Sequence, residues 1–300
     1  MKYARVSCVA LLALACFSSA LWSEEVTSGK PDGSAIQVLL IDGQNNHNWR
    51  ETSPVLKQLL EDTGLFEVKV ATSPDQGGNM ASFRPSLEGI DVIVMNYNGD
   101  DWSPEFQKDF EQYVANGGGL VIYHAANNAF PQWKEFNEMC AVGGWGNRDE
   151  KSGPYLYWEN GKETTSNEPG IGGSHGPQHE FQIEVVREHP ITKDLPKKFM
   201  HKADELYNRL RGPAKNVQIL ATAYSPLDKA GTGRNEPQLM VISYGKGRVF
   251  HIAYGHAGTH CRSVAFIVPF QRGTQWAATG KVTMPVPEDM PDEDKALTRE

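Results

Sequence analysis

The stretch Gly117-Gly118-Gly119-Leu120-Val121-Ile122-Tyr123-His124-Ala125-Ala126 joins a glycine-rich turn to an apolar run that ends on a histidine. A short apolar run bounded by glycine is typical of a strand that is buried on both faces of a parallel sheet. The carboxyl ends of such strands form the ligand crevice of α/β sheets, so His124 is our first candidate for a functional residue. The alternative is that His124 is a buried residue that only caps its strand.

Two earlier segments show the same pattern of an apolar run followed by a polar loop. Residues 36–41 precede the polar loop 42–49, and residues 91–96 precede a second polar loop. Amphipathic spacing and capping residues predict helices at 54–60 (with Ser53 as cap), 104–114 and 132–140. Strands that alternate with helices through short connections predict an α/β fold with a doubly wound, mostly parallel sheet and helices on both faces.

The regular pattern is lost after residue 141. Residues 164–178 are rich in Gly, Ser, Asn and Pro, which predicts a long irregular insertion. Nearby aromatic residues such as Trp145 and Trp158 favour a functional loop over a disordered one. Regular structure is expected again as strands at 181–186 and 217–224, a hairpin over 238–254, and a helix over 264–278 that Pro269 would kink or delay.

The amino-terminal residues have the pattern of a secretory signal peptide. Lys2 and Arg5 precede an apolar run, and small residues follow at 18–20. We therefore expect a signal peptide at 1–20 and an exported protein, periplasmic or extracellular, with lipoprotein anchoring through Cys16 as the less favoured alternative. The expected mature chain has a flexible leader at 21–35, one domain at 36–280 and an acidic, proline-containing tail at 281–300. No later segment is long and apolar enough to span a membrane.

Composition and missing motifs exclude several functional classes. The net charge is -8 and the basic residues form no stripe, which argues against a nucleic-acid partner and favours a small neutral ligand. The motifs of serine hydrolases, phosphate-binding loops and dinucleotide-binding strands are absent. Cleavage after residue 20 would leave Cys140 and Cys261, which we expect as isolated buried thiols, although the sequence leaves a disulfide between them open.

Histidines and acids stand beside strand ends in four separate loops: His47, His124, His175 with His179 and Glu180, and His256. A parallel sheet would bring the first two of these loops to one edge. Gly and Pro between His175 and His179 exclude the helix that a metal pair at this spacing needs, but His179 and Glu180 stay candidates as ligands on a turn. The alternative for His47 is a solvated loop residue.

Strand parity separates further candidates. In the strand over 248–254, His251 points with the core residues, whereas His256, past Gly255, faces the other way. In an extended segment Glu205 and Tyr207 share one face, and the preceding acid faces away from them. Glu205 is therefore a candidate general acid, general base or metal ligand, and its alternative is a solvated acid.

Several motifs occur together in the order of a known family: residues 117–126, His189-Pro190-Ile191, residues 204–207, and residues 244–256 with Trp276-Ala277. The chain resembles the trehalose-utilisation (ThuA-like) family over residues 36–280. The resemblance implies a fold like that of class I glutamine amidotransferases, with a flavodoxin-like sheet. Those enzymes carry a cysteine at the sharp turn after a central strand, where this chain has His124. Without a thiolate at the turn, we expect no amidotransferase activity.

The resemblance also implies action on disaccharides or on sugars oxidised to keto forms. Aromatic rings and amides suit such ligands, because sugar rings stack on aromatics and hydroxyls bond to amides. We expect His124, His256 and Glu205 to perform acid–base catalysis. No cofactor is certain, but a divalent metal such as zinc fits a histidine-rich site, with ligands from His179, Glu180, His124 and His256. The residues expected to bind the sugar are His47, Asn48, Trp49, Tyr207 and Trp145.

Two other classes stay open for the same crevice. The first is a non-catalytic carbohydrate-binding or sensing protein, and the second is an assembly domain. The sequence leaves the sugar, the reaction and the oligomeric state undetermined.

Overall fold

The computed structural model describes residue 30 and residues 33–300. The predicted signal peptide and most of the predicted leader lie outside the described residues. The described strands are β1 (Ile36–Asp42), β2 (Phe66–Thr72), β3 (Val92–Met95), β4 (Gly119–Tyr123), β5 (Tyr155–Glu159), β6 (Lys162–Ser166), β7 (His179–Val185), β8 (Lys198–Asp204), β9 (Val217–Tyr224), β10 (Asn235–Tyr244) and β11 (Gly247–Ile252). The helices are α1 (Trp49–Glu61), α2 (Pro104–Ala115), α3 (Lys134–Cys140), α4 (Gly258–Cys261) and α5 (Val264–Thr279).

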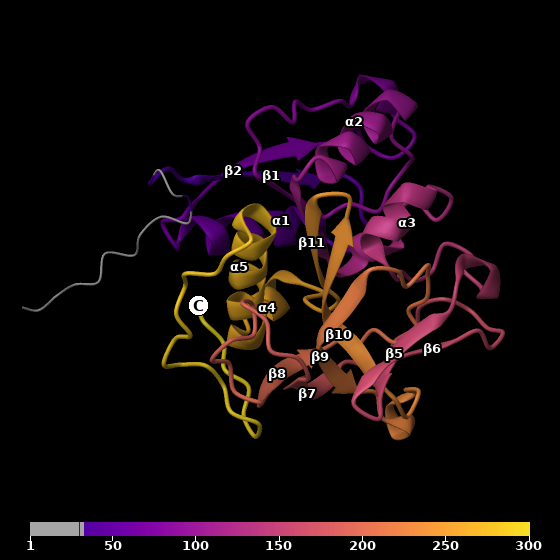
Figure 1. Cartoon of the computed structure of the whole chain (residues 1–300), viewed down its shortest axis with the longest axis vertical. Helices are drawn as coiled ribbons and strands as arrows, with labels where there is room; N and C mark the ends of the chain where they lie inside the picture. The colour runs from indigo at the N-terminus through magenta and orange to yellow at the C-terminus, as the bar shows by residue number, and fades with distance from the viewer. Residues whose placement is uncertain (1–29, 31–32) are drawn as a thin grey trace, which may run out of the picture.

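One mixed sheet runs through the described part of the chain, in the order β2-β1-β3-β4-β11-β10-β9-β7-β8 (Figure 1). The neighbouring strands β2, β1, β3, β4 and β11 are all parallel, which confirms the prediction of a parallel sheet for this half. From β10 onward the neighbours are antiparallel, so the sheet as a whole is less parallel than we expected. The burial patterns explain the difference: β3 and β4 are buried throughout, whereas β7 alternates between buried and partly exposed residues.

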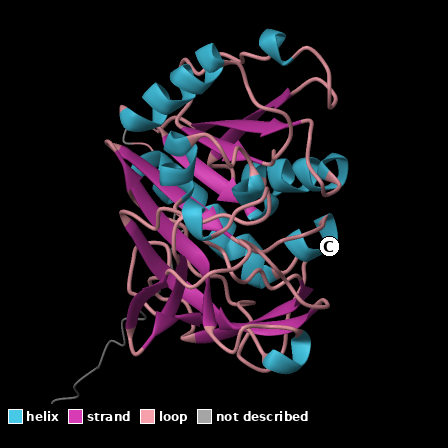
Figure 2. Cartoon of the chain, turned by 90° about the vertical axis from the view of Figure 1, so that its right-hand side faces the viewer, coloured by secondary structure: helices cyan, strands magenta, loops and turns pink. Residues whose placement is uncertain are grey.

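Two apolar cores lie on opposite faces of the parallel half, whose strands and helices Figure 2 shows from the side. Val92 and Val94 of β3 join the core that includes residues of α1 and α5, and Ile93 and Met95 join the core that includes residues of α2 and α3. Successive residues of a strand point to opposite faces, which is why one short strand serves both cores. The predicted helices on both faces are therefore present.

Three predicted element boundaries need correction. The first helix begins at Trp49, so Ser53 lies inside it and does not cap it. Residues 155–166 form the hairpin β5–β6 inside the segment that we expected to be irregular. No residue of β6 is fully buried, and its polar sequence has no apolar alternation that would have predicted a strand. Pro269 does not delay α5, which begins at Val264.

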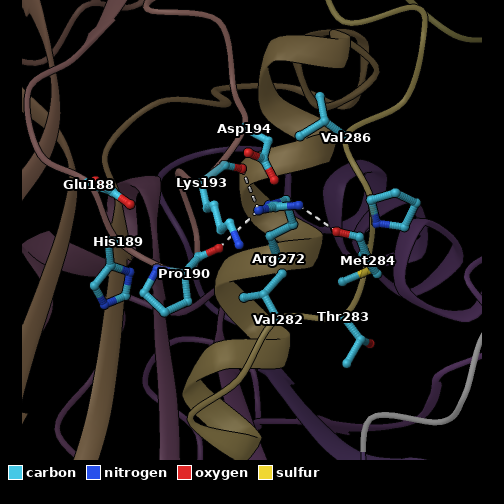
Figure 3. A pocket seen from close by; sticks show the side chains of 11 residues that line it. Glu188, His189, Pro190, Lys193, Asp194, Arg272, Val282, Thr283, Met284 and Val286 are labelled. Carbon is cyan, nitrogen blue, oxygen red and sulfur yellow. Dashed lines mark hydrogen bonds between the residues drawn. The ribbon is translucent and has the colours of Figure 1, made fainter.

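The carboxyl-terminal residues 281–300 pack on the domain, where we expected a tail. The guanidinium of Arg272 in α5 donates to the main-chain oxygens of Met284, Pro190, Ile191 and Lys193, as Figure 3 shows for three of them. A hollow of about 590 Å³ lies at this junction. We call residues 281–300 the C-terminal strap. None of the helices in the described part of the chain has the length and apolarity that a membrane span requires.

The glycine turn before β4 is required by close packing. A Cβ atom at Gly118 would lie 2.4 Å from the ring of Tyr113, and one at Gly119 would lie 2.5 Å from the main-chain oxygen of Ala277 in α5. Gly117 has a φ of 120°, a conformation that other residues rarely adopt. β4 can therefore lie this close to α5 only because the residues of the turn have no side chains.

His251 of β11 belongs to the core, as strand parity predicted. Its side chain is fully buried. Nδ1 donates to the main-chain oxygen of Cys140 at 3.1 Å, and Nε2 lies 3.1 Å from Nδ2 of Asn127. Burial, the largest cause, lowers the pKa of His251 to about 4.

We expect Gly119→Ala to lower the free energy of unfolding by about 3 kcal/mol, because the added methyl group meets main chain that cannot move away. Gly64→Ala is the control: Gly64 has a φ of 71° and open space around its Cβ position, so only backbone strain of about 1 kcal/mol is expected. Urea unfolding followed by circular dichroism measures both. Equal losses in the two variants would contradict the close-packing argument.

The burial of His251 predicts a pH dependence of stability. Below its unfolded pKa of about 6.5 the unfolded state takes up a proton that the folded state refuses until about pH 4. The free energy of unfolding should therefore fall as the pH decreases from 7.5 to 4, and His251→Gln should lose about 3 kcal/mol less over this interval than the wild type. Urea unfolding in the presence of a chelator measures the difference. Parallel pH curves for the two proteins would show that His251 is not responsible.

Candidate functional site

Four side chains that follow strand ends converge on one point. His47, His124, Glu205 and His256 each offer one ligand atom, and these atoms all lie within 4.8 Å of one another. The three histidines follow β1, β4 and β11 of the parallel half, and Glu205 follows β8 of the antiparallel half. Because the parallel strands end at one edge, sequence-distant loops meet there. The structure thus brings together His124, His256 and Glu205 with His47, which we had expected in the same pocket as a sugar-binding residue.

The ring of His124 is held in one orientation. Its Nδ1 donates to the main-chain oxygen of Ala253 at 2.9 Å, because a carbonyl oxygen can only accept. In the neutral ring Nε2 then carries a lone pair. Nε2 is buried, has no hydrogen-bond partner among the described residues and lies 3.7 Å from Oε2 of Glu205. The backbone of His124 has a φ of 42°, which is uncommon for a residue with a side chain.

Glu205 and His256 form a close but poorly aligned pair. Nδ1 of His256 lies 3.1 Å from Oε2 of Glu205, yet both atoms are buried without a hydrogen bond of good geometry. Burial alone would raise the pKa of Glu205, but the imidazoles of His124 and His256 outweigh it and lower that pKa. Glu205 in turn raises the pKa of His256, against the opposing effect of burial. Glu205 is therefore a carboxylate at neutral pH.

His47 and Tyr207 contact each other on one side of the cluster. Nε2 of His47 lies 3.1 Å from the hydroxyl of Tyr207. Burial lowers the pKa of His47 to about 3, with further contributions from His124 and His256, so this imidazole is neutral at physiological pH. Burial also raises the pKa of Tyr207 well above its usual value, and the charge of Glu205 adds to the effect. Tyr207 therefore stays a phenol that can donate a hydrogen bond.

The fully buried carboxylate of Asp204 positions two of the candidate ligands. It accepts hydrogen bonds from the main-chain N–H groups of Glu205 at 2.7 Å, Gly255 at 2.8 Å and His256 at 3.3 Å. His201 Nε2 lies 2.9 Å from the same carboxylate. Burial would raise the pKa of Asp204, but His201 and the other neighbouring imidazoles lower it to about 2.

His201 also lies 3.0 Å, through its Nδ1, from the hydroxyl of Ser263. The order of serine, histidine and acid is that of hydrolases, but Ser263, His201 and Asp204 are all fully buried. A substrate cannot reach this serine. The arrangement therefore supports the main chain of the site and supplies no nucleophile.

Aromatic rings form one wall of the site. The ring centroid of Trp145 lies 4.7 Å from that of Tyr207, and the centroid of His175 lies 6.1 Å from it. Nε2 of His175 lies 3.7 Å from Oε1 of Glu205, and its side chain is 37% exposed. We had named His175 beside a strand end without assigning it a site role. An isolated bridge between Ser174 and Asn208 aligns the loop of His175 with the segment of Tyr207. The sequence alone gives no signal for this bridge, so His175 was not assigned to the site.

Other predicted ligands lie outside the cluster. His179 and Glu180 begin β7, where His179 pairs with Asp204 of β8, and neither belongs to the group among the described residues. Nδ1 of His179 instead donates to the main-chain oxygen of Pro177. Asn48 is exposed, with its amide 3.4 Å from Glu51, and Trp49 begins α1 beside Arg50.

The two cysteines in the described residues are free thiols, as expected. Burial raises the pKa of Cys140 to about 12, and the thiol donates to the main-chain oxygen of Val142. Burial also raises the pKa of Cys261. Neither sulfur is therefore an activated thiolate at neutral pH.

Comparison with known proteins identifies the family. The sequence model of the ThuA family, described as trehalose utilisation, matches residues 37–277. The crystal structure of a ThuA-like protein from Parabacteroides merdae is 48% identical, with a TM-score of 0.87, over 89% of this chain and 98% of that one. A ThuA-like protein from Bacteroides uniformis is 19% identical, with a TM-score of 0.51, over 83% of this chain and 94% of that one, and shows the fold alone. No curated protein matches the chain. The chain belongs to the ThuA family.

Proposed function

We propose that the protein is a sugar-processing enzyme whose four converging side chains bind a divalent metal such as zinc. One observation carries the proposal. Nε2 of His124, Oε2 of Glu205 and Nδ1 of His256 are buried, close together and without hydrogen-bond partners in the part of the chain that the structure describes. Buried polar atoms nearly always have a partner, so three unpaired atoms at one point favour a bound cation.

All four residues fit such a metal in type, and His47 and Glu205 also fit it in protonation. Three imidazoles and a carboxylate are ligands of zinc and related ions. Ligands must be deprotonated, and His47 and Glu205 have pKa values lowered below their usual range. The hydrogen bond from His124 Nδ1 to a main-chain oxygen is the support that metal-bound histidines normally have. A bound metal would polarise a carbonyl or hydroxyl oxygen of the substrate.

The remaining side chains supply the other functions that a sugar site needs. His175 is outside the ligand group, partly exposed and next to Glu205, so we assign it the transfer of protons at the mouth of the site. Tyr207 is a buried neutral donor that orients His47, and Trp145 offers a ring face to a sugar. In this proposal His124, His256 and Glu205 act in catalysis as ligands that orient the reacting oxygen.

The substrate class follows from the family and from the wall of the site. The family is described as trehalose utilisation, and we propose a disaccharide or a keto-sugar as substrate. A non-catalytic carbohydrate-binding or sensing protein would have the same aromatic wall, but it would have no need for three unpaired ligand atoms. The unpaired atoms therefore favour the enzyme.

Two further proposals concern the chain as a whole. The pattern of residues 1–20 supports export of the protein. Five parallel strands with helices on both faces support a flavodoxin-like, doubly wound arrangement of the parallel half.

The metal proposal predicts about one equivalent of a divalent metal in the purified protein. Glu205→Gln and His124→Ala should each weaken zinc binding more than about 100-fold, because each removes a ligand atom. His179→Ala and Glu180→Gln are the matched controls, with the same side-chain changes outside the cluster. Elemental analysis and competition with a chromogenic chelator measure the effect.

The proposal also predicts that sugar turnover is lost after chelation and restored by zinc. Full zinc affinity in Glu205→Gln, with a folded protein by circular dichroism, would contradict the metal centre. Metal and sugar binding without any product from trehalose or its keto form would favour the binding protein.

A further inference from the structure

A second hollow of about 490 Å³ lies beside the candidate site, at the carboxyl ends of β1 and β3. Pockets that hold small molecules have volumes in the range of about 300–1,000 Å³, so one sugar ring fits. Amide side chains and an indole provide most of its lining: Gln44, Asn45, Asn46, Asn98, Gln76 and Trp49. This hollow shares the loops of the metal-binding candidates.

The main chain and side chains connect the hollow directly to the site. Asn46 precedes His47, and its Nδ2 lies 3.5 Å from Nε2 of that imidazole. Asn98 donates from Nδ2 to the main-chain oxygen of Ala125, the residue after His124, at 3.0 Å. A ligand that extends from the metal-binding candidates past His47 would therefore enter the hollow.

Some of the lining amides hold the wall, and other groups are available to a ligand. Gln44 donates to the main-chain oxygen of Pro74 and accepts from the main-chain N–H of Asp100, both at 2.8 Å. By contrast, the side-chain amide of Gln76 and the indole N–H of Trp49 make no hydrogen bond within residues 33–300. Gln44 is thus held in the wall, while the side-chain amide of Gln76 and the indole N–H of Trp49 can bond to a ligand.

The charge of the hollow restricts the ligand to a neutral one. Asp75 is the charged residue of the lining, and its carboxylate lies 3.4 Å from Arg50. Arg50, 4.2 Å from the centroid of the Trp49 ring, is a cation at the edge of the hollow, but its charge is offset by Asp75. No lysine or arginine belongs to the lining itself in the described part of the chain, so a phosphate would meet no unpaired cation there. A neutral ligand rich in hydroxyl groups suits amides, and its apolar ring face suits an indole.

We propose that this hollow binds the second, non-reacting ring of a disaccharide or glycoside, while the reacting ring lies between the metal-binding candidates and Trp145. The inference rests on the proposed function and names its substrate class as a sugar of two linked rings. The face of Trp49 opposite Arg50 stacks on the second ring, and Gln76 bonds to its hydroxyl groups. The prediction of Trp49 as a sugar-binding residue thereby receives a specific place.

Isothermal titration calorimetry of the zinc-loaded protein with trehalose and with glucose tests the subsite. Trp49→Ala should weaken trehalose binding about tenfold more than glucose binding, and Gln76→Ala should act in the same direction. Trp158→Ala is the matched control, because Trp158 also lies beside an arginine, Arg187, but outside the hollow. Zinc content, measured on each sample, should be the same in all variants.

The outcomes separate the subsite from the metal centre. Equal effects of Trp49→Ala on both sugars, or no effect on trehalose, would overturn the subsite and leave the metal centre intact. A selective loss of trehalose affinity in a protein that does not hold zinc would support the subsite and contradict the metal centre. If the zinc-loaded wild type binds neither sugar, the two-ring subsite and the proposed sugar chemistry are both wrong.

Discussion

The buried carboxylate of Asp204 holds the two halves of this fold together at the site. Removing a carboxylate from water costs several kcal/mol, and only short hydrogen bonds from well-placed donors offset that cost. Here the donors are main-chain N–H groups of Glu205, Gly255 and His256, together with the ring of His201. The end of β8 is thereby fixed against the loop after β11. The spacing of Glu205 and His256 depends on this one interaction.

The site needs both halves of the sheet because each supplies a different chemistry. The parallel half contributes imidazoles from the ends of its strands, at the edge where such folds bind ligands. The antiparallel half contributes the carboxylate of Glu205, the phenol of Tyr207 and the exposed ring of His175. The C-terminal strap is tied to α5, since the main-chain oxygen of Leu297 accepts from the main-chain N–H of Val264 at the start of that helix.

Strand periodicity predicted much of the fold and part of the site. Apolar runs identified β1, β3 and β4, and parity separated His251 from His256 and placed Glu205 with Tyr207. These predictions depend on local backbone geometry, which the sequence determines directly. The position of His175 and the exclusion of His179 depend on strand register and on a bridge between loops, which involve residues far apart in the chain. The β5–β6 hairpin was not predicted, because its second strand is polar and only partly buried.

The turn at His124 shows how one backbone geometry can serve a different chemistry. The sequence resemblance implies a fold like that of amidotransferases, in which a nucleophilic cysteine occupies this neighbourhood. In this chain His124 has a φ of 42°, a conformation that costs about 1–2 kcal/mol for a residue with a Cβ atom. The hydrogen bond from Nδ1 to Ala253 offsets part of that cost and directs the Nε2 lone pair toward Glu205. An imidazole held this way is a poor nucleophile but a well-oriented ligand, because its reactive nitrogen faces other ligand atoms and is buried from substrate. In the proposed function, this turn therefore orients a metal ligand at the place where the resemblance implies a thiol in acyl-transfer enzymes.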